Sequence, residues 1–231
     1  MSDPERFISV ASAADRADAS AFLSRALRTD DSAVVRLHTR SDGLIGLWAN
    51  SGFDVLVTRS VFGRLRPGDI VCDATTLRTG LASLEPNTPL DPGFSLDSAW
   101  RGALPPDTGY VHLDDVPART VVELSRNGAH LARTQGSAHG PATGLLDQDV
   151  LELSGIDGDP IGVSLRSLFA LTAMGFIRDQ HGREITENSA VDDIAETEPV
   201  RIRLSGPWIR IDARYGSVYR RRGRSLDLTA L

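Results

Sequence analysis

The chain has 231 residues, a formal net charge of −6, and 41% hydrophobic residues. All 25 of its basic residues are arginine, which excludes lysine-dependent chemistry such as Schiff bases, pyridoxal phosphate attachment and the phosphate-gripping lysines of P-loops and kinases. The single cysteine, Cys72, excludes an internal disulfide and any site that needs several thiolates from one chain. We therefore expect a compact protein of one large or two ordinary domains, with Cys72 buried in a strand.

The N-terminus is acidic and no apolar run follows it, which predicts that the chain lacks a signal peptide. No window reaches the roughly 18 apolar residues of a membrane helix. We expect a cytoplasmic protein without a membrane partner. The complete absence of lysine is typical of a very GC-rich coding sequence, which points to a high-GC bacterium.

The first half predicts a strand, a helix, four strands and a second helix. A strand at 6–10 precedes an amphipathic helix at 11–28. The turn Asp42-Gly43 between two alternating apolar runs is the strongest hairpin signal in the chain. The remaining elements are expected at 33–39, 44–49, 54–60 and 70–73 for the strands and at 75–84 for the helix.

An irregular connection follows, because five prolines fall among glycines and acids between residues 85 and 107. We place the domain boundary there, giving an N-terminal domain at 1–107 and a C-terminal domain at 108–231. The second domain is expected to begin with a helix, with Asp115 as its N-cap, Pro117 close behind and an end near residue 134.

Residues 145–165 allow two interpretations. They form either helices, or a hairpin in which 150–153 pairs with 161–164 across an Asp-Gly turn. A helix at 165–174 should end at Gly175, which suits the C′ position. The tail predicts three strands at 200–204, 208–212 and 217–220, and an acidic loop, mobile or partly helical, is expected at 184–198.

The charge of the second half is unevenly spread. Residues 146–199 hold 12 acids and 3 arginines, whereas residues 200–231 hold 8 arginines and 2 acids. Guanidinium groups beside aromatic rings suit phosphate contact and base stacking. The candidate partner-binding residues are Arg201, Arg203, Trp208, Arg210, Arg214, Tyr215, Arg220, Arg221 and Arg222. The alternative is a solvated sheet face whose arginines pair with the acidic loop upstream.

A second group of candidates lies near the middle of the chain. Ser137 and His139 could supply a nucleophile and a base, or His139 could bind a metal with Asp147 and Asp149. Their spacing matches no known catalytic motif. We therefore favour a protein that is not an enzyme, and we predict no cofactor and no metal.

Several segments of the first half resemble one repeat of a DNA sliding clamp. The resemblance covers residues 6–85 and rests on the segments 44–48, 53–57 and 67–81. In that family the same order of strands ends in a helix that lines the central hole, and the protein is acidic overall. The likeness implies a topology, since fold does not carry function by itself. The second half of such a repeat is not recognisable after Leu84.

Two further resemblances concern the second half. Residues 146–155 and 164–177 resemble the second and third helices of a winged-helix regulator, with residues 176–186 as its wing, although only Arg166 stands where a base-reading side chain is needed. The chain as a whole, especially residues 119–177, resembles uncharacterised actinobacterial proteins, which implies no activity.

Together these features predict an α+β protein of two related halves, each with a helix, a mainly antiparallel sheet and a second helix. The leading hypothesis is a non-enzymatic binding or regulatory module whose C-terminal arginine-rich sheet contacts nucleic acid or an acidic protein. The alternatives are an enzyme of unknown class that uses the His139 loop, or a homo-oligomer formed through the edge of the last strand.

Overall fold

The computed structural model describes residues 5–135, 143–155 and 158–222. The first half contains β1 (Phe7–Val10), α1 (Ala13–Thr29), β2 (Val34–Thr39), β3 (Ile45–Asn50), β4 (Leu56–Val61), β5 (Gly63–Arg66), β6 (Asp69–Asp73) and α2 (Ala74–Ser83). The second half contains β7 (Val111–Pro117), α3 (Ala118–Gln135), α4 (Thr143–Leu146), β8 (Asp149–Ser154), β9 (Pro160–Ser164), α5 (Leu165–Ala173), β10 (Pro199–Ser205), β11 (Trp208–Ala213) and β12 (Gly216–Arg221). Two short 3-10 helices, η1 (Asp97–Ala99) and η2 (Val191–Asp193), lie in the longer connections. The fold is therefore α+β, as predicted.

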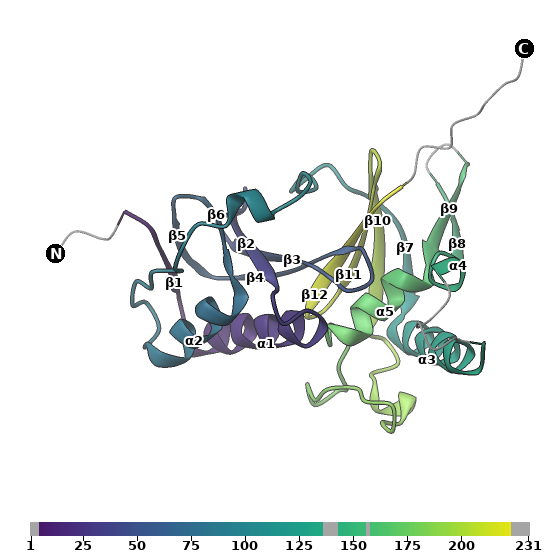
Figure 1. Ribbon diagram of the computed structural model, residues 1–231. Coiled ribbons are helices and arrows are strands. Elements are labelled where there is room, and N and C mark those ends of the chain that lie inside the picture. Colours follow the sequence, from purple (N-terminus) through teal and green to yellow (C-terminus); the bar gives the residue numbers. More distant parts are fainter. Residues whose placement is uncertain (1–4, 136–142, 156–157, 223–231) are drawn as a thin grey trace, which may run out of the picture.

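One antiparallel sheet of eight strands runs through both halves, in the order β6-β2-β3-β4-β12-β11-β10-β7. The helices α2, α1, α5 and α3 lie along one side of it (Figure 1). Each half contributes three consecutive antiparallel strands that follow a helix, β2–β4 after α1 and β10–β12 after α5. Each half also contributes an outer strand that leads into another helix, β6 into α2 and β7 into α3. The two halves are thus related in the way that the sequence predicted.

Local sequence explains where the helices begin and end. Ser12 caps α1 by accepting a hydrogen bond from the backbone N–H of Asp15, and Asp73 caps α2 in the same way through Thr76. Helix α5 ends in a Schellman motif, because Gly175 has a φ of +58° and the N–H of Phe176 bonds to the carbonyl of Leu171. The predicted C′ role of Gly175 is confirmed.

The halves meet where β4 pairs with β12, a junction that we call the seam. Only three residue pairs form this ladder, Thr58 with Ser217, Val57 with Val218 and Leu56 with Tyr219. The rings of Trp48 and Tyr219 lie 5.0 Å apart beside it, and both side chains are fully buried. Because aromatic side chains bury a large apolar area, this pair adds much of the stability that a short ladder lacks.

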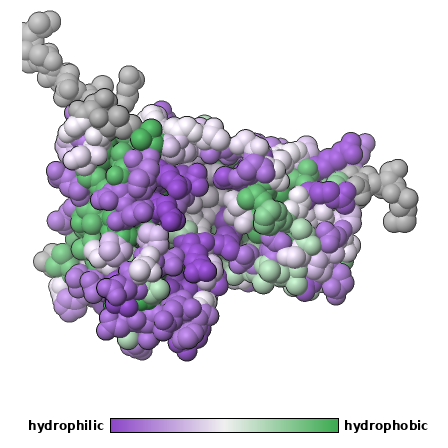
Figure 2. All heavy atoms as spheres, turned by 180° about the vertical axis from the view of Figure 1, so that it is seen from behind, coloured by the Kyte–Doolittle hydropathy of each residue, from purple (hydrophilic) through white to green (hydrophobic). Residues whose placement is uncertain are grey.

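A second contact joins the helices across the seam. Phe22 of α1 stacks on Phe176, which follows α5, with ring centroids 6.5 Å apart. Arg25 of α1 lies next to Gly175 and forms an ion pair with Glu184. The buried apolar residues of both halves form one continuous core. Seen from behind, the surface is mostly hydrophilic, with smaller apolar patches on each half (Figure 2).

Three sequence predictions for the second half are wrong. Asp115 lies inside β7 and caps no helix, so this half begins on a strand, as the first half does. Strands β8 and β9 pair antiparallel, which confirms the hairpin alternative for residues 145–165 and shows that the winged-helix interpretation of this segment is wrong. The last strand, β12, is not an edge, because β11 and β4 flank it; the outer strands are β6 and β7.

Other expectations are confirmed or stay open. Cys72 is fully buried, and burial raises the pKa of its thiol to about 12, as expected of an inert cysteine. The acidic loop contains the short helix η2. The part of the chain that the structure describes holds no helix long and apolar enough to cross a membrane. The domain boundary between residues 107 and 108 stays a prediction.

Gly216→Ala should destabilise the seam. A Cβ at this position would lie 2.3 Å from the ring of Phe176, which is buried against Phe22 and cannot move freely. We expect a loss of about 1–3 kcal/mol in the free energy of unfolding, measured by urea denaturation. The control is Gly144→Ala, where nothing lies within 4 Å of the new methyl group; equal stability of both variants would contradict the tight contact.

The seam should also lose stability in alkali. Burial raises the pKa of Tyr219 to about 12, above its ordinary value of 10. Because the folded state holds this proton more tightly, the stability gained is complete below pH 10 and is lost as the pH rises through about 12. Between pH 8 and pH 11, the wild type should lose about 1 kcal/mol more than Tyr219→Phe in urea titrations. Tyr215→Phe is the control, and parallel losses in wild type and Tyr219→Phe would exclude this assignment.

Candidate functional site

Side chains of the eight-stranded sheet alternate between the face that the helices cover and the opposite face, which we call the open face. Along β10 and β11 the helix-side residues Ile202, Ile209 and Ile211 are buried. Cross-strand pairing therefore places five of the candidate binding residues on the open face, namely Arg201, Arg203, Trp208, Arg210 and Arg221.

The remaining candidates lie elsewhere. Arg220 is opposite Ile209 in the ladder, so it belongs to the helix side, where its guanidinium lies 3.7 Å from the carboxylates of both Asp147 and Asp149. Arg214 and Tyr215 form the turn between β11 and β12, and Arg222 follows β12. The predicted arginine face is therefore divided, and the binding role of its residues stays a prediction.

Asp212 organises the arginines in the middle of the open face. It is buried between Arg203 and Arg210, and the Nε of Arg210 lies 2.7 Å from its carboxylate. Ser217 donates a further hydrogen bond to the same carboxylate. Arg201 lies 3.8 Å from Asp115 of β7. In the acidic loop at 184–198, only Glu198 forms an ion pair with a candidate arginine among the described residues, at 3.6 Å from Arg214. The alternative in which the arginines of the sheet pair with this loop therefore holds for Arg214 alone within the described residues.

A cavity lined by several of these residues lies at one end of the seam, and we call it the seam hollow. Its volume is about 650 Å³. It is lined by Asn50, Asp54, Val55, Leu56, Arg101, Gly102, Ala103, Asp147, Arg166, Trp208, Tyr219, Arg220 and Arg221. Walls therefore come from both halves and from the connection between them.

Four arginines and two aspartates line the seam hollow, so its side chains carry a net positive charge. Arg166 is buried, donates to the carbonyl of Phe53 at 2.7 Å and lies 2.9 Å from Asp147. Arg220 shares that carboxylate. By contrast, Arg101 and Arg221 have no carboxylate within ion-pair distance in the described ranges. Arg221 stands directly opposite Trp208 in the ladder.

The residues proposed for catalysis do not assemble into a described site. Ser137 and His139 lie outside the described residues. Asp147 and Asp149 are described, and both pair with arginines. Within the described ranges no group of three or more His, Cys, Asp or Glu side chains could hold a metal ion. The enzyme hypothesis is therefore untested at its central residues.

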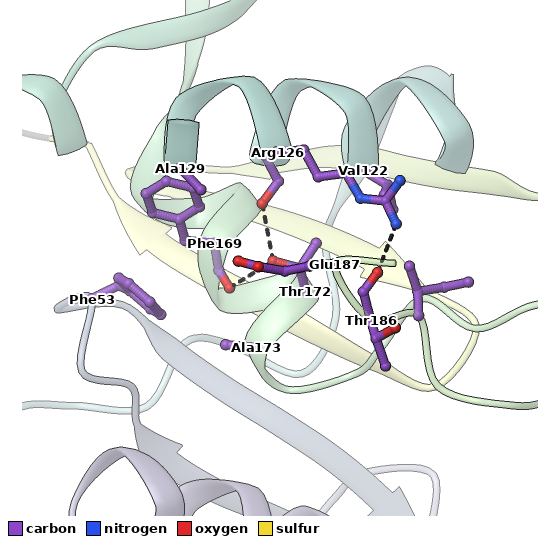
Figure 3. Close-up of a pocket in the computed structure, with 11 residues that line it drawn as sticks. Phe53, Val122, Arg126, Ala129, Phe169, Thr172, Ala173, Thr186 and Glu187 are labelled. Atoms are coloured by element: carbon purple, nitrogen blue, oxygen red, sulfur yellow. Dashed lines mark hydrogen bonds between the residues drawn. The ribbon is translucent and has the colours of Figure 1, made fainter. Parts of the chain in front are cut away.

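A second cavity lies on the helix side, between α3, α5 and residues 185–187 (Figure 3). Its volume is about 350 Å³, and Phe53, Phe169 and Val122 give it an apolar wall. The hydroxyls of Ser125 and Thr172 lie 3.1 Å apart and satisfy each other. Arg126 donates to the carbonyl of Thr186 at 2.7 Å and closes one side. Its polar groups are thus already paired.

Sequence reasoning did not place Arg101 or Arg166 in a cavity. Arg101 stands in the proline-rich connection, and Arg166, in the first turn of an apolar helix, was considered only as the base-reading residue of a winged helix. Neither position has a local signal for a cavity. The one available hint for Arg166 was a charged side chain on a helix that is otherwise buried, because such a charge needs a partner.

In a comparison with known proteins, one family model matches each half. A family described as a domain of unknown function, DUF8010, matches residues 3–102, and another, DUF8185, matches residues 105–225, which is more than half of the chain. The chain belongs to the DUF8185 family. No curated protein matches the sequence of this DUF8185 member.

Solved structures show that its fold is that of sliding clamps. Two are from Caulobacter crescentus, a pol III beta protein and a DNA polymerase sliding clamp, each with a TM-score of 0.51 and 13% identity. A third, described as a DNA polymerase III beta subunit from Eubacterium rectale, has a TM-score of 0.53 and 12% identity. They match 93–94% of this chain but only 64–65% of their own length.

The predicted clamp resemblance is therefore confirmed, and it extends beyond the first half. Both halves take part in the match, although the sequence showed no likeness after Leu84. The chain spans less than two thirds of these clamp proteins, and at such low identity the likeness concerns the fold alone.

Asp212→Asn should destabilise this DUF8185 protein strongly. The change leaves Arg203 and Arg210 without their shared carboxylate in a mostly buried position. We expect a loss of about 2–4 kcal/mol in urea unfolding at pH 7. Asp115→Asn is the matched control, because Asp115 is half exposed and lies 3.8 Å from Arg201, and it should change stability by less than about 0.5 kcal/mol. A small loss for Asp212→Asn would mean that the arginines are stable without it.

Proposed function

We propose that this protein is a non-enzymatic binding scaffold that holds single-stranded nucleic acid in the seam hollow. The observation that carries the proposal is the position of Arg101 and Arg221, whose guanidinium groups lack a carboxylate partner among the described residues. Arg221 is the cross-strand neighbour of Trp208, and Arg101 lines the same cavity. Free guanidinium groups attract phosphates, and an indole ring offers a surface on which a base can stack.

The other two arginines of the hollow have a different role in this proposal. Asp147 and Asp149 already neutralise Arg166 and Arg220, so these side chains shape the wall and contribute little charge. The volume of about 650 Å³ suits one or two nucleotides more than a duplex. The binding energy should therefore come from few phosphate contacts together with stacking.

Nucleic acid is favoured over an acidic protein for two reasons. An acidic protein surface would use the arginines but would gain nothing specific from the plane of Trp208. In addition, the similar clamp structures carry names that refer to DNA polymerase. For the protein as a whole we propose a cytoplasmic location, an actinobacterial origin, and domains at 1–107 and 108–231.

The test is fluorescence anisotropy of a labelled random-sequence single strand across a salt series. We expect the logarithm of the binding constant to fall linearly with the logarithm of the salt concentration, with a slope of about −1.4 to −3 for two to four phosphate contacts. The double variant Arg101→Ala/Arg221→Ala should weaken binding on the order of tenfold at low salt and reduce the slope by about 1.

The matched control is Arg28→Ala/Arg133→Ala, which removes two exposed arginines from helices α1 and α3. It has the same net charge as Arg101→Ala/Arg221→Ala. Trp208→Ala should weaken binding without changing the slope, because it removes stacking and no charge. Absence of binding at low salt would refute the proposal. Equal weakening by both double variants would show that binding depends on the overall charge and not on the hollow.

A further inference from the structure

A third concave site lies at the opposite end of β12 from the seam hollow, and we call it the Arg40 hollow. Its volume is about 380 Å³. It is lined by Arg40, Thr58, Arg59, Ser60, Arg203, Arg210, Asp212, Ala213, Arg214, Gly216 and Ser217. Five of these side chains are guanidinium groups and only one is a carboxylate.

The carboxylate cannot neutralise the arginines around it. Asp212 is shared between Arg203 and Arg210, and it also accepts the hydroxyl hydrogen of Ser217. Arg40, Arg59 and Arg214 have partners of their own, Asp42, Asp18 and Glu198, and none of these acids lines the hollow. Five guanidinium groups therefore share four carboxylates, of which only Asp212 lines the space inside, so positive charge exceeds negative charge there.

Two buried hydrogen-bond donors next to this space have no partner. The hydroxyl of Thr58 is buried in the lining, and its Oγ1 makes no hydrogen bond. Trp48 is the direct cross-strand neighbour of Thr58, and its Nε1 is also unpaired. A Cβ at Gly46 would lie 2.8 Å from this Nε1 and 3.5 Å from Cδ of Arg40, so the indole N–H and the Arg40 side chain lie close to the same point beside Gly46. Buried polar groups are nearly always hydrogen-bonded, so two adjacent exceptions need an explanation.

The Trp48 indole, the Thr58 hydroxyl and the guanidinium groups of the lining can all donate hydrogen bonds. An indole N–H is only a donor, a guanidinium group is only a donor, and the Thr58 hydroxyl can donate. A ligand that completes this site must therefore offer several acceptors and negative charge in a small volume. A phosphate group fits, because it carries charge close to −2 and three acceptor oxygens, and guanidinium groups bind it in a bidentate manner.

We propose that the Arg40 hollow binds a phosphate group, with Arg40, Arg203 and Arg210 as the charged contacts and the Thr58 hydroxyl as a donor once its side chain turns toward the space. The group can belong to an inorganic ion or to the end of a small phosphorylated molecule, and both present the same chemistry to these residues. The site is separate from the seam hollow and does not depend on the function proposed for it.

The test is thermal unfolding of the full chain with inorganic phosphate, pyrophosphate or ATP, at constant ionic strength set with sodium chloride. A ligand that binds only the folded state raises Tm as its concentration rises. We expect a concentration-dependent rise with at least one of these probes. A rise with phosphate and pyrophosphate identifies a site for the ion, and a rise with ATP alone identifies a site for a terminal phosphate.

The decisive variant is Thr58→Val, which preserves the shape of the side chain and removes the unpaired hydroxyl. Without ligand it should unfold at the same temperature as the wild type or higher, because an unsatisfied buried group is lost. Its affinity for the probe, measured by isothermal titration calorimetry, should fall on the order of tenfold. Arg40→Gln should weaken binding similarly, and Thr79→Val, on the exposed side of α2, should leave it unchanged.

Two results would overturn the proposal. The first is no change in Tm with any probe up to about 10 mM, well above the range of a phosphate site with useful affinity. The second is binding that Thr58→Val and Arg40→Gln leave unchanged, which would place the anion elsewhere. Single-strand binding by Arg101→Ala/Arg221→Ala is measured separately, so failure of either proposal can be told from failure of the other.

Discussion

The pairing of β4 with β12 is the interaction on which the rest of the structure depends. Three residue pairs join two four-stranded units into one sheet, and the open face, the seam hollow and the Arg40 hollow all include residues beside this ladder. A ladder of this length is marginal without side-chain packing. The Trp48–Tyr219 contact on one face and the Phe22–Phe176 stack on the other supply that packing.

Arginine takes every role in this protein that other proteins divide between arginine and lysine. Its planar group can serve several acceptors at once, and several arginines here bind backbone carbonyls as well as acids. Arg126 donates to the carbonyls of Thr186 and Ser189, and Arg119 to that of Ile194. The acidic segment 184–198 is thus held mainly by helix arginines, which is why it does not cover the arginines of the sheet.

Much of the fold could be predicted because its signals are local. The Asp42-Gly43 hairpin, the helix that ends at Gly175 and the three tail strands each depend on short patterns, and all are present. Strand β7 was missed because an edge strand tolerates exposed acids and a terminal proline, so Asp114, Asp115 and Pro117 look like the start of a helix. Strand β5 has only four residues, too few to show a pattern.

The sites were harder to predict than the fold, because they depend on which strand lies beside which. Alternation along the tail placed Arg201 and Arg203 on one face, but only the register shows that Arg220 points to the other. Likewise, Arg101 and Arg166 lie far from Trp208 in sequence and line one cavity with it only in the folded chain. No local pattern encodes such a meeting.

The walls of the seam hollow come from two bodies that share one sheet, so its shape depends on the twist of that sheet between β4 and β12. A sheet of eight strands is a continuous elastic element, and bending it at the seam would move Asn50 and Asp54 of the first half relative to Arg166 and Arg221 of the second. A change in the curvature of the sheet at the seam therefore also changes the width of the seam hollow.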